Sequence, residues 1–386
     1  MSQRQATKEQ QQIIEATEGN IRVRAVPGSG KTFALTKRIV YLILELYVEP
    51  SSIVAMTFTN KAANEMKYRL KKMIGDFATC YAGTFHGYCN LILKEEIYRL
   101  SYPKTFVILD KKAQVDLIRE VADELGFSLK DFTAKEYADK ICEEKQDRAY
   151  IPLMLDTGRE ALQKKIGHTE DPFYQVYYSY LKKQRDNYVL DFEDIIQFAI
   201  YILTQYKEAL KKWQSRCQYL LCDEYQDVNK NQEYLLYLLS GKYHNLTVVG
   251  DDDQSIYKFR GANITNILNF EKEYPDAKVV KLEQNYRSCG NILAAANAVI
   301  KHNEGRKDKA LWTDQGDGEK IVFNQSEDEY MEADRVVNEI IRLTANGAQY
   351  KDIALLYRTN AQSRILGEKL VMRGIPHRVY GGQNFY

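Results

Sequence analysis

A glycine-rich loop lies near the start of the sequence, between an apolar run and a helical pattern. The run IRVRA at 21–25 leads into VPGSGKT at 26–32, and FALTKRIVYLILEL follows. Glycines in such a loop allow a tight turn that points backbone amides and a helix N-terminus at phosphate oxygens. Lys31 adds a cation, and the Thr32 hydroxyl suits Mg²⁺. Ala25 stands where the full eight-residue pattern has Gly, yet the order strand, GSGKT, helix predicts a phosphate site. Its expected residues are Gly28, Ser29, Gly30, Lys31 and Thr32.

Two adjacent carboxylates end a second apolar run, YLLCDE at 219–224. At the tip of a strand, both can reach one bound ion and its water. We expect Asp223 to orient Mg²⁺ and Glu224 to activate the attacking water as a general base. An Asp-Glu pair after a strand is more commonly a helix N-terminus, but downstream of a phosphate loop it favours nucleotide hydrolysis.

A third run, VVGDDDQSIYKFRGA at 248–262, repeats this order of apolar segment, turn and polar cluster. Gln254 suits a contact with the γ-phosphate or its water. Tyr257 and Phe259 alternate with the basic residues Lys258 and Arg260, so their rings are suited to stacking on bases. A pair of aromatic residues in a core explains the local pattern equally well.

Further polar groups follow other apolar runs. LEQNYRSCG at 282–290 offers Tyr286 for adenine stacking and Arg287 for phosphate charge, although a surface loop is an equal alternative. TFTNKAANEM at 57–66 and GTFHGYC at 83–89 combine hydroxyl, amide and aromatic groups suited to a sugar-phosphate backbone and a stacked base. Taken alone, His86 in the second of these is more typical of a packed or surface histidine.

The elements that must position these groups alternate between apolar β-branched runs and helical patterns. Strands are expected in seven runs: 21–25, 52–58, 219–224, 246–251, 277–283, 321–323 and 353–358. That alternation is typical of parallel α/β domains. Between about 111 and 189 it gives way to charged amphipathic helices, which predicts an all-helical insertion.

Composition narrows the class of protein. The 386 residues are 45% hydrophobic and 28% charged, as in soluble globular proteins, and suffice for two or three domains. The sequence shows no membrane span and no signal peptide, so a cytoplasmic location is expected. The six cysteines lack metal-ligand spacing and are expected to be reduced. Because the net charge of the protein is only +1, a polyanionic partner must be held by a local site. Most of the 29 tyrosines are expected to pack against other residues.

In this order and spacing, the motifs resemble those of superfamily 1 DNA helicases of the UvrD/Rep/PcrA type. The resemblance extends from Gln10 to Tyr386 and rests on TFTNKAA, DEYQD, GDDDQSIYKFRGA, QNYRS and LLYRTNAQSR. It implies a P-loop NTPase fold: a RecA-like ATP-binding domain 1A at 1–110 and 190–285, a helical insertion 1B at 111–189, and the first part of a second RecA-like domain, 2A, at 286–386. It also implies 3′-to-5′ movement on single-stranded DNA, driven by ATP and Mg²⁺, with single-strand/duplex junctions as partners.

The resemblance assigns roles position by position. Gln10 corresponds to the glutamine that reads adenine, Lys31 and Thr32 hold phosphate and Mg²⁺, and Asp223 and Glu224 act as above. Gln254 links the γ-phosphate to DNA, while Tyr286 stacks on adenine and Arg287 contacts the γ-phosphate. The expected DNA contacts are Phe58, Asn60, Thr84, His86, Tyr257, Phe259, Arg260, Arg358 and Asn360.

The sequence also departs from the family pattern. Phe259 stands where Trp is common, Phe33 where Arg is common, and Ala6-Thr7 where Leu-Asn is usual. The family motifs expected beyond GGQNFY, including one with a second arginine, are not among these residues. The chain therefore matches the first part of such a helicase, whose C-terminal remainder is a further expected partner, and slow hydrolysis by this stretch alone is expected.

Two other classes of function remain open at this point. One is a nucleotide-dependent DNA-binding switch or partner subunit that does not unwind DNA. The other is a P-loop kinase or GTPase, which would have no use for QNYRS and YRTNAQSR. Nucleotide preference and DNA-stimulated hydrolysis distinguish the three classes.

Overall fold

The structure is a computed structural model that describes residues 5–128, 133–156, 160–256, 263–303, 309 and 311–380. The chain divides into two compact units, Met1–Gly318 and Glu319–Tyr386. Each unit is described by itself below.

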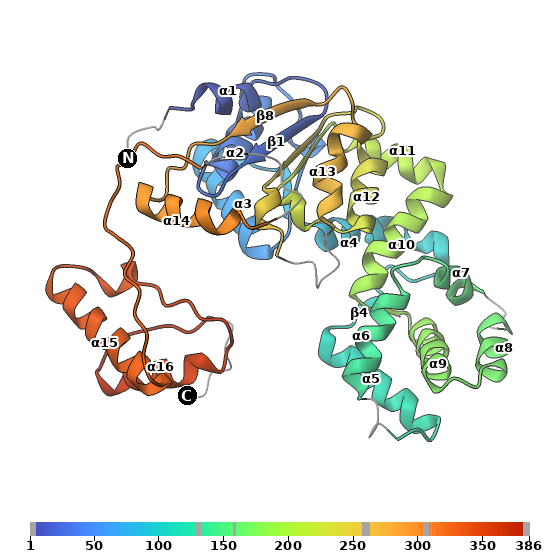
Figure 1. The fold of residues 1–386 in the computed structure, drawn as a ribbon. Coiled ribbons are helices and arrows are strands. Elements are labelled where there is room, and N and C mark those ends of the chain that lie inside the picture. The colour runs from blue at the N-terminus through green and yellow to red at the C-terminus, as the bar shows by residue number, and fades with distance from the viewer. Residues whose placement is uncertain are drawn as a thin grey trace. The chain divides into compact units, whose positions relative to one another are not determined.

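A six-stranded parallel sheet forms the centre of the first unit (Figure 1). Its strands lie in the order β3-β2-β6-β7-β1-β8. Their bounds are β1 Ile21–Ala25, β2 Ile53–Thr57, β3 Tyr81–Thr84, β6 Tyr219–Cys222, β7 Leu246–Gly250 and β8 Lys278–Leu282. Every residue of β2, β6 and β7 is buried, as expected where helices cover both faces of a parallel sheet. Five of the seven predicted strands are confirmed.

Alternating side chains of β2 contribute to two separate hydrophobic cores. Val54 and Met56 belong to one core, and Ile53 and Ala55 to the other, because successive side chains of a strand point to opposite faces. The helices of this α/β unit are α1 Lys8–Ile14, α2 Lys31–Leu44, α3 Asn60–Ile74, α4 Phe85–Glu96, α10 Phe192–Gln205, α11 Lys207–Ser215, α12 Lys230–Ser240, α13 Ile264–Glu273 and α14 Gly290–Ile300.

In the described residues between β4 (Val107–Ile108) and β5 (Val189–Leu190), the chain forms five further helices, and Figure 1 shows them grouped apart from the large sheet. They are α5 Lys111–Glu124, α6 Ala134–Glu144, α7 Tyr150–Leu155, α8 Glu160–His168 and α9 Pro172–Asp186. β4 and β5 pair in parallel, so the chain leaves and re-enters the α/β layer at neighbouring points. The predicted helical character of this stretch is confirmed.

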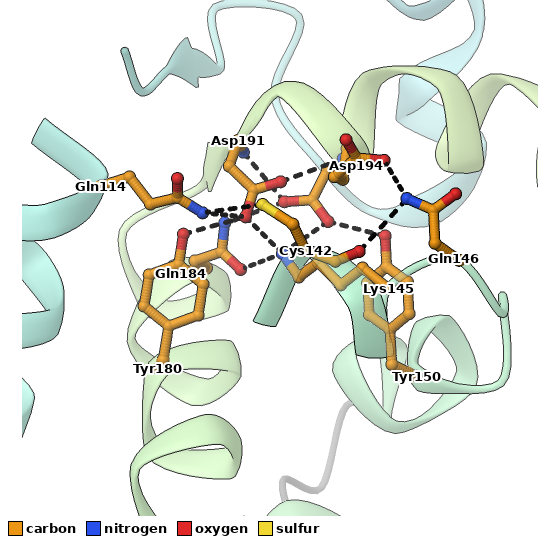
Figure 2. A network of polar contacts seen from close by, with 10 residues as sticks. Gln114, Cys142, Lys145, Gln146, Tyr150, Tyr180, Gln184, Asp191 and Asp194 are labelled. Carbon is orange, nitrogen blue, oxygen red and sulfur yellow. Dashed lines mark hydrogen bonds and ion pairs between the residues drawn. The ribbon is translucent and has the colours of Figure 1, made fainter. Parts of the chain in front are cut away.

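A buried ion cluster joins these helices to the start of α10 (Figure 2). The Nζ atom of Lys145 lies 2.7 Å from Asp191 Oδ2 and 2.8 Å from Asp194 Oδ1, and its side chain is fully buried. Tyr150 donates a hydrogen bond of 2.7 Å to Asp194, and Tyr180 one of 2.9 Å to Asp191. Asp191 and Asp194 also form the capping box of α10. One lysine thus satisfies both carboxylates that begin this helix.

The second unit contains α15 (Glu329–Ala345) and α16 (Gln362–Met372), and its small core includes Val337 and Leu370. The strands predicted at 321–323 and 353–358 are wrong, because neither run forms a strand in the structure. A strand needs a hydrogen-bonded neighbour, and the described residues of this unit provide none. Phe323 is accordingly 87% exposed and Leu356 96% exposed. In the described part of both units, no helix is long and apolar enough to cross a membrane.

Candidate functional site

The glycine loop is closed on one side by the segment that follows β8. Gly28 and Gly30 have φ angles of 69° and 85°, which favour glycine. A Cβ atom on Gly28 would lie 2.7 Å from Asn285 Nδ2 and 2.8 Å from Arg287 Cβ. Asn285 Nδ2 donates to Pro27 O at 2.6 Å, and the Tyr286 amide donates to Gly28 O at 3.0 Å. The structure therefore brings the predicted phosphate loop and the predicted Tyr286-Arg287 pair together.

Gln10 reaches the same loop from α1. Thr7 and Gln10 form the capping box of this helix, and Gln10 Nε2 donates to Ser29 O at 3.0 Å. Gly30 is close enough that an added Cβ atom would lie 2.8 Å from Gln10 Nε2. Beside them lies a pocket of about 190 Å³. Its lining residues are Thr7, Glu9, Gln10, Ser29, Lys281, Leu282, Glu283, Gln284, Tyr286 and Trp312.

The pocket has groups suited to a purine base. Tyr286 and Trp312 contribute aromatic rings, and Gln10 carries an amide able both to donate and to accept hydrogen bonds. Trp312 is 51% exposed, and its carbonyl accepts from the Asn285 amide at 2.8 Å. Trp312 and Asn285 were missed in the sequence. Asn285 had a signal, its place inside QNYRS, whereas nothing local marks Trp312.

The two adjacent carboxylates lie opposite the glycine loop that is predicted to bind phosphate. Lys31, the first residue of α2, places Nζ 2.9 Å from Glu224 Oε2. Thr32 is the next residue of this helix. Asp223 follows β6 directly and is 4% exposed, and its Oδ1 accepts from the Glu224 amide at 3.0 Å. Glu224 has a φ of 51°, an uncommon left-handed conformation that begins the turn after the strand.

These charges separate the pKa values of the two carboxyl groups. Burial, and then the neighbouring charge of Glu224, raise the pKa of Asp223 to about 6. Burial is also the strongest single influence on Glu224, but the Lys31 charge and the hydrogen bonds from Gln226 and Lys31 together outweigh it and hold the pKa of Glu224 below its usual value. Glu224 is therefore the first of the two to ionise as the pH rises, and it is ionised at neutral pH, as a general base must be.

Gln254 is connected to Glu224 through two intervening residues. Gln226 Nε2 donates to Glu224 Oε2 at 2.8 Å, and Gln226 Oε1 accepts from the Asp251 amide at 3.0 Å. Asp251 Oδ2 in turn accepts from Gln254 Nε2 at 2.7 Å. Gln226, missed in the sequence although it lies within DEYQD, links the ends of β6 and β7.

Four of the predicted DNA contacts follow the carboxyl ends of β2 and β3. Phe58 is half-buried and Asn60 is exposed at the start of α3. Thr84 caps α4, where its hydroxyl accepts from the Gly87 amide at 3.2 Å. His86 packs edge-on against Phe192, with ring centroids 5.7 Å apart. β2 and β3 are parallel neighbours, so these side chains begin at one edge of the sheet.

Phe192 extends this group of side chains. It is the first residue of α10 and is 49% exposed, so its ring is both held by His86 and open to solvent. Burial lowers the pKa of His86, which favours the neutral imidazole. In the sequence, Phe192 within DFEDIIQFA gave no signal by itself, and only the contact with His86 shows its place.

None of the predicted DNA contacts is tested by this geometry, and five of them belong to other parts of the chain. Tyr257, Phe259 and Arg260 lie outside the described residues. Arg358 and Asn360 are exposed residues of the second unit, which is described by itself.

Comparison with known families agrees with this site. Residues 6–275 match the UvrD/REP helicase N-terminal domain, and residues 280–386 match the UvrD-like helicase C-terminal domain. The chain belongs to the UvrD/REP helicase family. Its six-stranded sheet belongs to a RecA-like α/β domain of that family, and part of the C-terminal domain follows from residue 280.

Curated UvrD/REP relatives include the ATP-dependent DNA helicases PcrA of Staphylococcus aureus and Staphylococcus epidermidis. Each is 42% identical over 379 residues, which cover 98% of this chain and 51% of the relative. The chain thus spans about half the length of these curated relatives.

Proposed function

We propose that this chain is the motor portion of an ATP-dependent DNA helicase that moves 3′-to-5′ along single-stranded DNA. The observation that carries the proposal is the convergence of the glycine loop, Lys31, Glu224 and the Tyr286-Arg287 segment at one edge of the sheet. The names of the PcrA relatives, ATP-dependent DNA helicases, support the same assignment. We place the protein in the cytoplasm, with single-stranded DNA and its duplex junctions as partners.

The nucleotide would be held by two groups of residues. Adenine would lie in the pocket of Gln10 and Tyr286, and the phosphates would lie against the amides of 28–32 and the Lys31 ammonium. Mg²⁺ prefers oxygen ligands and keeps several waters, so the Thr32 hydroxyl and the buried Asp223 carboxylate fit its chemistry. When bound, this ion supplies charge neutralisation at the β- and γ-phosphates.

Hydrolysis would then depend on proton transfer and on positive charge. Glu224 is the base that takes a proton from the attacking water, and Lys31 passes from Glu224 to the phosphate oxygens when nucleotide binds. Arg287 supplies a guanidinium to charge that develops on the γ-phosphate. Gln254, hydrogen-bonded to Asp251, would relay the presence of the γ-phosphate to the predicted DNA-binding residues at 257–260.

DNA would contact the residues that follow β2 and β3 together with those of 257–260. The rings of Phe58, His86 and Phe192 offer stacking faces, and the exposed Asn60 amide suits a phosphate or sugar. Stacking does not depend on base identity, so binding with little sequence preference is expected.

A direct test is steady-state hydrolysis by the purified 386-residue chain with and without single-stranded DNA. We expect slow ATP hydrolysis by these 386 residues, because Arg287 supplies one guanidinium and the family motif with a second arginine is not among them. An arginine finger contributes about 10³ to 10⁵ in rate. DNA should stimulate the turnover, and Glu224→Gln should abolish it. ATP and DNA binding with no turnover in any condition would favour the nucleotide-dependent binding switch instead. Failure to bind ATP would overturn the proposal.

A further inference from the structure

A lysine far along the chain contacts the acidic turn that carries Gln254. Lys309 Nζ forms ion pairs with Asp251, with Asp252 Oδ1 at 2.6 Å and with Asp253 Oδ2 at 3.1 Å. The Lys309 side chain is only 7% exposed, and that of Asp251 is fully buried. Lys309 belongs to the stretch that matches the C-terminal family model, yet its amine lies at the end of β7.

The burial of Asp251 makes its ion pair with Lys309 important for keeping the carboxylate ionised and in place. A fully buried carboxylate is stable in its ionised form only when a cation or several hydrogen bonds compensate for its lost hydration. Asp251 has Lys309 and the Asp253 amide on Oδ1, and Gln254 Nε2 on Oδ2. The same carboxylate therefore joins the Lys309 ammonium to the Gln254 amide.

The residues just after Lys309 contact the nucleotide pocket. Trp312 lines the pocket and forms a parallel bridge with Gln284. Gln315 Nε2 donates to the carbonyl of Tyr286 at 2.7 Å. One short segment thus contacts the turn of Gln254 at one end and the Tyr286 loop at the other.

We infer that Lys309 is a positioning residue that couples nucleotide binding to DNA binding by holding Asp251, and through it Gln254, in place. The inference rests on the proposed function, because it concerns how the two binding events of that function communicate. When nucleotide orders the Tyr286 loop, the contacts of Trp312 and Gln315 with that loop, and of Lys309 with Asp251, transmit the change to the turn before the predicted DNA residues at 257–260. Removal of the Lys309 charge leaves the buried Asp251 carboxylate without its cation. The carboxylate can then turn away and release the Gln254 amide.

The test compares variants of the full 386-residue chain. Lys309→Met removes the charge and keeps much of the length, Lys309→Arg retains the charge, and Lys301→Met removes an exposed lysine at the end of α14 as a matched control. Fluorescence anisotropy measures the affinity for a labelled oligothymidine with and without a non-hydrolysable ATP analogue. The ratio of the two dissociation constants is the coupling factor, which typically lies between about 5 and 150 for linked sites.

We expect Lys309→Met to bring the coupling factor close to one, while Lys309→Arg and Lys301→Met keep the parent value. In a Gln254→Ala background, Lys309→Met should have no further effect on coupling, because the two residues act in series through Asp251. Unchanged coupling in Lys309→Met, or equal losses in Lys309→Arg, would overturn the inference. So would a parent chain that binds both ligands without coupling. A parent chain that binds neither ATP nor DNA would instead show that the proposed function itself fails.

Discussion

The amine of Lys31 lies 2.9 Å from a carboxylate oxygen of Glu224, although 193 positions separate the two residues. In the structure, the cation of the phosphate loop and the expected general base thus neutralise each other. In the proposed function, nucleotide phosphates would take Lys31 from Glu224, and that exchange would leave Glu224 free to accept a proton. The ion pair therefore gives a physical reason why the base would become available only when ATP binds.

Substitutions of Lys31 and Glu224 should have different effects on ATP binding. Lys31→Ala should weaken Mg-ATP binding at least tenfold, because the phosphates lose their main side-chain cation. Glu224→Gln should bind ATP as tightly as the parent or more tightly, because it removes a negative charge from the phosphate site, and should not hydrolyse it. Titration with a fluorescent ATP analogue measures both effects. Lys37→Ala, on the same helix, is the control, and equal binding by Lys31→Ala and parent would refute the phosphate-loop assignment.

The position of Trp312 in the pocket beside Gln10 predicts that nucleotide binding changes the intrinsic fluorescence of the chain. The chain has two tryptophans, and Trp312 is 51% exposed at the pocket whereas Trp213 is 2% exposed in the core. Nucleotide binding should change the emission of Trp312, because the base excludes water from the indole. Trp312→Phe should abolish the ATP-dependent change, and Trp213→Phe should keep it. A change that persists in Trp312→Phe would place the base elsewhere.

Phe192 should contribute to DNA affinity. Stacking is worth about 1 to 3 kcal/mol per base, so Phe192→Ala should weaken binding of single-stranded DNA about 5- to 150-fold at any sequence. The control is Phe77→Ala, a 66%-exposed ring that follows the carboxyl-terminal end of α3, opposite the end that carries Asn60. Anisotropy titrations with oligonucleotides of different base composition measure the effect. Equal losses in both variants would exclude a specific role for Phe192.

The buried cluster around Lys145 should control the stability of the helical insertion. Lys145→Met leaves Asp191 and Asp194 buried without their cation, which typically costs about 3 to 5 kcal/mol. Lys111→Met is the control, because it breaks an ion pair with Asp139 whose side chains are 54% and 57% exposed, and such pairs contribute about 1 kcal/mol or less. Urea unfolding followed by circular dichroism measures both. Similar losses of unfolding free energy in Lys145→Met and Lys111→Met would mean that the buried cluster relaxes or admits water.

The residues within each motif, and the order of elements around it, were predictable from sequence. Glycines before a helix, carboxylates after an apolar run and the change to helical periodicity after position 110 all depend on backbone geometry and side-chain patterning over a few turns of chain. For that reason the glycine turn before α2, five strands of the large sheet and the helical stretch were correctly predicted. Gln10 was predicted from the resemblance alone, and its contact with the loop appears only in the structure.

The tertiary structure decided which distant groups meet. β1 lies between β7 and β8, so the Tyr286 segment closes over the glycine loop, and no local pattern encodes that strand order. Trp312, Phe192 and Lys309 acquire their places only through contacts with residues far away in the sequence. The same reason explains the two wrong strands at 321–323 and 353–358. An apolar β-branched run has the propensity to be extended, but a strand exists only when another chain segment satisfies its backbone hydrogen bonds.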